Sequence, residues 1–184
     1  MSVFAARDLA YMPLVEALAV DELGERVVVT VSRPLDGGRR IRDLWTLKGG
    51  ALERSTTSDR DDREPVLDPD GGTWFLRGPD APVEGRGRPA GVWLRRPDGV
   101  ESIQAEAPLG IIGFQRRRGR LVVEAPLLPD IPLAHQEDAV AARVARLQNA
   151  RRYRSLPVRD WDHWRGPGES ALVEVRPSGA LRTL

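Results

Sequence analysis

The chain has 184 residues, and 28 basic side chains nearly balance 27 acidic ones, for a formal net charge of +1. This balance argues against nucleic acid or an anionic membrane as a partner, because both require a clustered basic face. The chain has no cysteine, which excludes disulfides, thiolate zinc sites and a cysteine nucleophile, and suits an intracellular protein. Since no apolar run is long enough to cross a bilayer and charges come too early for a signal peptide, we expect a cytoplasmic protein.

A first unit of strands is predicted over about residues 15–55. Val27–Ser32 is a β-branched run, which is typical of a strand buried on both faces. Asp43–Leu47 alternates apolar and polar residues, and two glycines then turn the chain into a short further strand. Pro13 argues against one continuous helix before Val20, so part of that segment is expected to be a strand.

A second unit follows over about residues 64–104, after the polar connection Ser55–Glu64. The unit contains the predicted strands Thr73–Leu76 and Gly91–Arg95, each next to a Pro-Asp-Gly turn. Four carboxylates at the end of the connection are expected to lie in a solvated loop: Asp59, Asp61, Asp62 and Glu64.

The third unit is predicted over about residues 109–184, beginning with a strand at Leu109–Phe114. An insertion at 126–166 interrupts it before the strand Ala171–Val175. Within the insertion, Ala134–Tyr153 predicts a helix, because acidic residues occupy its first turn and arginines its last. This helix is expected to lie on the surface of the sheets or of a partner, with a docking or gating role beside a cavity as the alternative.

Landmarks of the three units recur with one period. Gly24, Gly71 and Gly119 in the first hairpin of each unit are 47 and 48 residues apart, and Trp45 and Trp93 are 48 apart. A four-stranded unit that repeats at this spacing is typical of β-propeller blades. The predicted fold class is therefore all-β, a partial β-propeller of about three four-stranded blades with one helical insertion in the third blade. A β-sandwich with coincidental turn spacing is the alternative.

Three blades are too few to close a propeller, since known propellers have about 4–8 blades. Open sheet edges would also favour aggregation. We therefore expect the chain, 1–184, to be one part of a longer propeller, or to assemble with the missing blades, for which a homo-oligomer is one form. A smaller fold that only shares the repeat is the alternative.

Several short motifs carry a resemblance to a known family. Leu156–Gly166 reads Leu-Pro-Val-Arg-Asp-Trp-Asp-His-Trp-Arg-Gly, between the predicted helix and an Ala-Leu-Val-Glu-Val strand. Asp68–Gly71 is an Asp-Pro-Asp-Gly turn, and Asp43–Leu47 is followed by two glycines. In this order the motifs resemble the propeller domain of bacterial serine peptidases of the prolyl oligopeptidase family, in its acylaminoacyl-peptidase-like branch. The turns Asp21–Gly24 and Arg116–Gly119 depart from the Pro-Asp-Gly form of that family.

The resemblance implies a non-catalytic role for this chain. In the family, the propeller limits access to the active site, so that short peptides are the substrates, and an α/β-hydrolase domain outside the propeller carries the catalytic triad. The partners implied are thus the remaining blades, a hydrolase domain and a short peptide. The alternative is a non-catalytic propeller-like binding or scaffold protein without any hydrolase.

The residues themselves also predict no catalytic group. No Gly-x-Ser-x-Gly motif occurs, and the nearest string, around Ser170, lacks the second glycine. No cofactor or metal site is expected either, because His135 and His163 are 28 residues apart and Asp68–Gly71 lacks the later ligands of a calcium loop.

Four tryptophans and two polar residues remain as candidates. Trp45 and Trp93 are predicted to be structural residues of strands, and Trp161 and Trp164 to anchor the insertion onto a blade. If Leu156–Gly166 contacts substrate, the candidate substrate-binding residues are Arg159 and His163. They would face a central cavity and meet a charged terminus or carbonyl groups of a peptide.

Overall fold

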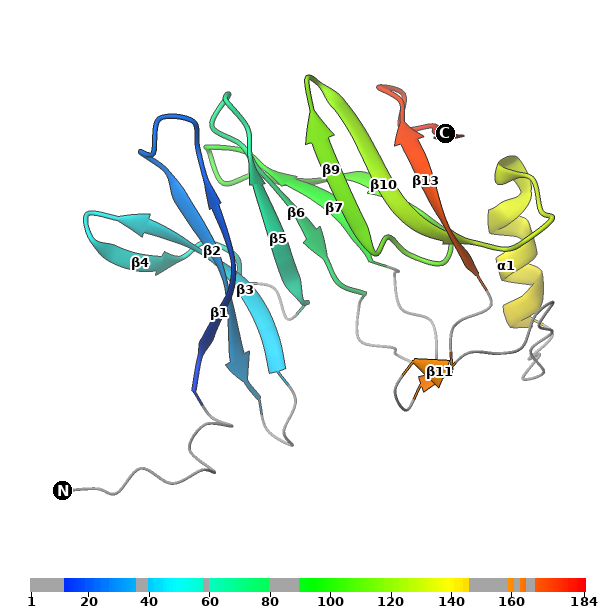
Figure 1. Ribbon diagram of the computed structural model, residues 1–184, viewed down its shortest axis with the longest axis horizontal. Helices are drawn as coiled ribbons and strands as arrows, with labels where there is room; N and C mark the ends of the chain where they lie inside the picture. The colour runs from blue at the N-terminus through cyan, green and yellow to red at the C-terminus, as the bar shows by residue number, and fades with distance from the viewer. Residues whose placement is uncertain are drawn as a thin grey trace. The chain divides into compact units, whose positions relative to one another are not determined.

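The computed structural model describes residues 12–35, 40–57, 60–79, 90–145, 159–160, 163–164 and 168–184, the two short pairs by their backbone alone. The described strands form three four-stranded antiparallel sheets and one two-stranded hairpin (Figure 1). The predicted all-β class with three four-stranded units is thereby confirmed, whereas closure into a propeller is not shown. The chain divides into two compact units, residues 1–104 and 105–184. No helix among the described residues is long and apolar enough to span a membrane.

The first sheet contains β1 (Leu14–Val20), β2 (Val27–Pro34), β3 (Arg40–Lys48) and β4 (Ala51–Arg54), in chain order. Strand β2 is the buried centre, as its run of β-branched residues predicts. The β3–β4 hairpin closes through two glycines with positive φ, which matches a type I′ turn and its right-handed twist.

The second sheet contains β5 (Asp62–Leu67), β6 (Thr73–Arg77), β7 (Gly91–Arg95) and β8 (Glu101–Glu106). All five residues of β6 are buried. Its central residue, Phe75, packs with Val28 and Leu44 of the first sheet in one core cluster, with Leu67 and Trp93 beside them. The first unit is therefore held together by sheet-on-sheet packing of apolar faces.

The third sheet contains β9 (Gly113–Arg117), β10 (Arg120–Leu127), β13 (Glu169–Val175) and β14 (Leu181–Thr183). The insertion between β10 and β13 carries a short 3₁₀ helix at Leu133–His135, α1 (Gln136–Ala145) and the hairpin of β11 (Arg159–Asp160) and β12 (His163–Trp164). The predicted helical insertion is therefore confirmed. Its expected C-terminal part, residues 146–153, lies outside the described residues.

The first strand of the third sheet begins later than predicted. The prediction of a strand at Leu109–Phe114 is wrong for most of its length, since β9 covers Gly113–Arg117. The cause is a turn at Gly110, which has a φ of +87° and donates a hydrogen bond of 2.8 Å to the carbonyl of Ala107. Glycine adopts this conformation without the steric penalty of a side chain, so a local turn replaces the apolar strand.

One turn type recurs where proline is the second residue. In the turns that begin at Asp68, Arg96 and Arg176, the glycine N–H donates to the carbonyl of the first residue over 2.9, 2.9 and 2.8 Å. Proline presets φ for the second position, and the fourth position needs the positive φ that glycine supplies. These turns were predicted from the sequence, and the structure confirms them.

A buried glutamine attaches the insertion to the third sheet. The Gln136 side chain, at the start of α1, accepts a hydrogen bond from the Leu128 N–H at 2.8 Å and donates to the Leu128 carbonyl at 2.9 Å. It also donates to the Ile131 carbonyl at 2.7 Å. Because all three partners are backbone groups of the segment that directly follows β10, this one side chain fixes where the helix begins.

Candidate functional site

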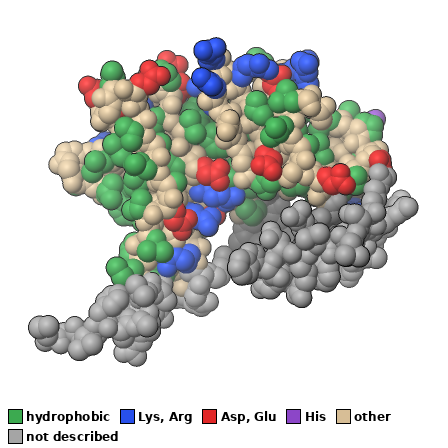
Figure 2. All heavy atoms as spheres, in the orientation of Figure 1, with side chains coloured by type: hydrophobic (Ala, Val, Ile, Leu, Met, Phe, Trp, Pro, Cys, Tyr) green, Lys and Arg blue, Asp and Glu red, His purple; other side chains and the backbone are tan. Residues whose placement is uncertain are grey.

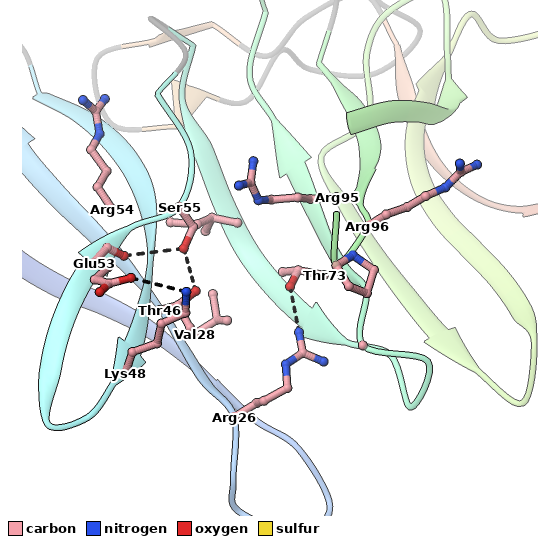
Figure 3. A pocket seen from close by; sticks show the side chains of 13 residues that line it. Arg26, Val28, Thr46, Lys48, Glu53, Arg54, Ser55, Thr73, Arg95 and Arg96 are labelled. Carbon is pink, nitrogen blue, oxygen red and sulfur yellow. Dashed lines mark hydrogen bonds and ion pairs between the residues drawn. The ribbon is translucent and has the colours of Figure 1, made fainter. Parts of the chain in front are cut away.

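A pocket of about 500 Å³ lies within the first unit, between the first and second sheets (Figure 3). The strands β2, β3 and β4 form one side near their hairpin ends, and the β5–β6 and β7–β8 turns with the adjoining strand ends form the other. Its volume is within the range of small-molecule sites. We call it the basic pocket because five of the six charged residues that line it are cations: Arg26, Lys48, Glu53, Arg54, Arg95 and Arg96.

Carboxylates partly neutralise Lys48 and Arg54. Lys48 Nζ lies 3.3 Å from Glu53 Oε2 at the pocket wall. Arg54 Nη2 lies 2.7 Å from Asp43 Oδ1, a fully buried carboxylate that also pairs with Arg33. Figure 3 shows the Arg54 head group extending away from the other cations. These two residues therefore add little free positive charge to the pocket.

Arg26 has no carboxylate partner among the described residues. Its Nη2 donates a hydrogen bond of 3.3 Å to Thr73 Oγ1, joining the start of β2 to the start of β6 (Figure 3). Because the threonine oxygen is the acceptor, the hydroxyl proton of Thr73 stays available to another acceptor. Arg96 likewise forms no ion pair with a described residue, but its head group points away from the pocket in Figure 3.

A chain of ion pairs holds Arg95 in place from inside the second sheet. Fully buried Asp62 accepts two hydrogen bonds from Arg77, at 2.7 and 2.8 Å. Arg77 Nη1 donates to Glu101 at 2.7 Å, and the other oxygen of Glu101 accepts from Arg95 Nη1 at 3.2 Å. The expectation of a solvated loop is therefore wrong for Asp62, which lies in β5 directly opposite Arg77. The guanidinium of Arg95 thus meets the pocket from a preorganised position.

Aromatic rings complete this chain of ion pairs. The Arg77 guanidinium lies 4.7 Å from the ring centre of Trp93 and 5.0 Å from that of Phe75, a geometry in which the ring face attracts the cation. Burial alone would lower the pKa of Arg77, but hydrogen bonds and charge from Asp62 and Glu101 outweigh it and raise the pKa. The two carboxylates therefore favour the charged form of Arg77 despite its burial.

The turns of the second sheet form the far wall of the pocket. Gly71 has a φ of +87°, and a Cβ added there would lie 3.0 Å from Pro97 Cγ. The turn before it is held by the Trp74 indole N–H, which donates to Asp68 Oδ2 at 3.1 Å. A side chain at position 71 would strain the backbone and press on Pro97, so glycine is required for the two turns to approach.

The predicted substrate-binding residues lie in the β11–β12 hairpin. Arg159 pairs with Trp164, and Asp160 with His163, so Arg159 and His163 are not directly opposite each other. Their side chains, and the whole of Trp161, lie outside the described residues. A role for Arg159 and His163 in binding, and for the two tryptophans in anchoring the insertion, stays a prediction.

The other tryptophans lie in strands of the first unit. Trp45 in β3 and Trp93 in β7 are both partly buried, and their indole nitrogens are buried without a hydrogen-bond partner among the described residues. Trp93 stacks on Arg77, whereas Trp45 lies opposite Val29 and Arg54 in the sheet.

Two features bear on chemistry. Ser170 lies within β13, paired with Pro126, whereas a nucleophile elbow requires a sharp turn from strand to helix. Within the described ranges, no group of three or more histidine, aspartate or glutamate side chains is placed to hold a metal ion.

No family model matches the chain, and no curated protein matches it either. The geometry of the basic pocket and the repeat architecture are therefore the basis for a functional proposal.

The sequence did contain a signal for the pocket, although no motif carried it. Arg26 comes two residues after Gly24 of the turn between the first two strands of the first sheet, and Arg95 and Arg96 directly precede Pro97 in the turn between the last two strands of the second sheet. In an antiparallel four-stranded meander these two turns lie at the same end of the sheet, so arginines beside them are brought to that end. Their convergence also required the packing of two sheets, which spacing alone does not show.

Proposed function

We propose that this chain consists of three consecutive blades of the propeller type and acts as a non-catalytic binding module, with the basic pocket as its ligand site. The observation that carries the binding role is the pocket itself, which has more cations than carboxylates and lies between two packed sheets. Rigid sheets that present a site at their turns are a frequent design of binding proteins.

The blade assignment is supported by topology. Each sheet follows the chain order of its strands, without the long return connection of a Greek-key sandwich. The turn between the first two strands and the turn between the last two strands are therefore at the same end of each sheet, as in propeller blades.

The outer face of the first sheet supports the proposal that further blades pack against this chain. Val15, Leu18 and Val20 lie opposite Val31, Val29 and Val27 of β2, on the face that points away from the Val28 cluster: these three residues of β1 are 63, 62 and 50% exposed. Figure 2 shows hydrophobic side chains gathered on the surface over the first sheet. A terminal repeat needs a polar outer face for solubility, and an apolar one suits a blade that another blade covers.

A second candidate function is the propeller part of a serine peptidase of the prolyl oligopeptidase family, which would gate and position short peptides for an α/β-hydrolase domain outside residues 1–184. The Asp-Pro-Asp-Gly turn favours it, since this turn carries the resemblance and adopts the hydrogen-bonded form described above. The remaining blades and the hydrolase domain would then be its partners.

Fluorophosphonate labelling of the natural, complete gene product distinguishes the two candidates, because the reagent reacts with the activated serine of a hydrolase triad. A binding module gives no labelled band, before or after heat denaturation. The control is a known serine hydrolase added to the same sample. A labelled band that disappears on denaturation would reject the non-catalytic module and support the peptidase.

A further inference from the structure

We propose that the ligand of the basic pocket is a small molecule that carries a phosphate monoester. This inference rests on the proposed binding function and adds the chemical class of the ligand. It follows from the charge of the pocket, from the donors that line it and from its volume.

The charge of the pocket exceeds what its own acids compensate. Five cations and one carboxylate line it, and three of the cations have a carboxylate within 3.3 Å, namely Glu53, Asp43 or Glu101. The two that remain, Arg26 and Arg96, have no such partner in the described part of the chain, and of these Arg26 points into the pocket (Figure 3). An anionic ligand would compensate the charge of Arg26, and a phosphate monoester carries about −1.5 to −2 at neutral pH.

Three residues with hydrogen-bond donors line the pocket: Arg26, Thr73 and Arg95. Figure 3 shows the Arg26 head group reaching Thr73 and the Arg95 head group turned toward the first sheet. The Thr73 hydroxyl, which accepts from Arg26, can donate its own proton to a ligand oxygen. Arg95 reaches Glu101 through Nη1, so its Nη2 remains available. A phosphate presents three terminal oxygens to these three donors, whereas a carboxylate presents two.

The rest of the lining suits the organic part of such an ester. Pro97 forms an apolar wall, and the buried side chains of Val28 and Leu44 form the apolar floor. A volume of about 500 Å³ accepts a small molecule but not a folded protein segment. The pocket therefore combines an anion site with a small apolar surface.

Isothermal titration calorimetry with two matched probes tests the proposal. Phenyl phosphate and benzoate share an aromatic ring and differ in the anionic group, and each is titrated into the natural protein in phosphate-free buffer. We expect saturable binding of phenyl phosphate, with a Kd at least about tenfold lower than that of benzoate, since the additional charge-assisted hydrogen bonds account for such a factor.

Variants then locate the binding. Arg26→Gln removes the uncompensated charge, and Thr73→Val removes the hydroxyl while keeping the shape of the side chain. Each should raise the Kd for phenyl phosphate by about tenfold or more. Arg182→Gln is the matched control, because this exposed arginine belongs to the third sheet, and its Kd should stay within about twofold of the natural protein. Far-UV circular dichroism confirms that each variant is folded.

The outcomes separate the two proposals. Equal affinity for benzoate and phenyl phosphate would overturn the phosphate assignment and leave the anion-binding module intact. The absence of saturable binding for both probes up to about 10 mM, which is weaker than a typical metabolite site, would overturn both proposals. If Arg26→Gln and Thr73→Val, both folded, bind phenyl phosphate as the natural protein does, the phosphate site is not in this pocket and the inference fails.

Discussion

The buried pair Asp62–Arg77 provides a sharp test of how the second sheet is stabilised. The two residues are cross-strand neighbours in β5 and β6 and are joined by two hydrogen bonds of 2.7 and 2.8 Å. The side-chain exposure is 0% for Asp62 and 6% for Arg77. Arg77→Met keeps an unbranched side chain beside Trp93 but removes the cation and the two hydrogen bonds that Arg77 donates to the buried carboxylate of Asp62.

The expected loss of stability is large. Breaking a buried ion pair by removing one partner costs about 3–5 kcal/mol, because the other charge stays buried. For a chain of this size, that corresponds to a decrease in Tm of roughly 6–20 °C. Because the pKa of Arg77 is raised, its contribution is present below the ordinary pKa and is lost only above the raised one. The cost of Arg77→Met that comes from the cation should thus be the same from about pH 6 to pH 10.

The double variant distinguishes pairing from packing. In Asp62→Leu/Arg77→Met, two apolar side chains replace the cross-strand pair, and a buried pair replaced in this way is often neutral or stabilising within about 1–4 kcal/mol. We therefore expect the double variant to be at least about 2 kcal/mol more stable than Arg77→Met alone. Glu101 keeps Arg95 as a partner in both variants.

Urea denaturation followed by far-UV circular dichroism measures these free energies of unfolding, since tryptophan fluorescence would report the local change at Trp93. The matched control is Arg120→Met, which removes an exposed pair with Glu174 in the third sheet and should cost at most about 1 kcal/mol. The reasoning is refuted if Arg77→Met costs no more than this control, or if the double variant is no more stable than the single one.

Two further changes test the outer face of the first sheet and a hairpin of the third. If another blade covers this face, Leu18→Asp in the natural assembly should lower Tm by several degrees, because it would bury an unpaired charge. The control Leu23→Asp, in the neighbouring exposed turn, should leave Tm unchanged. Equal effects of the two variants in differential scanning calorimetry would argue against a covering blade. Arg118→Asn should stabilise the protein by about 0.5–1 kcal/mol in urea denaturation. Arg118 and Gly119 have φ values of +52° and +75°, and asparagine tolerates this position of a type I′ turn better than arginine does. A loss of stability would contradict the assignment of the turn.

Elements governed by local chemistry were predictable. The β-branched run of β2 and the Pro-Asp-Gly turns lie where the sequence placed them, because side-chain branching and the φ preferences of proline and glycine act within a few residues. The start of β9 was not, since an apolar run is compatible with a strand or a buried turn, and Gly110 decided for the turn.

The contacts of the candidate site were beyond local reasoning. Asp62 occurs in a run of polar residues that indicates solvent exposure, yet it is fully buried and paired with Arg77 on the adjacent strand. Since Arg77 is 15 residues away, the local sequence does not show this pair. The distance in sequence between Arg26 and Thr73 is 47 residues, and their hydrogen bond exists only because the first and second sheets pack together.

The sequence by itself thus determined the all-β class, the order of three four-stranded units and the place of the helical insertion, since alternation, turn residues and their period are properties of short segments. Only the tertiary structure decided which charges are buried in pairs and which remain uncompensated in the basic pocket. That outcome depends on which strands become neighbours and on how two apolar sheet faces pack, and both are set by the free energy of the whole unit rather than by any one segment.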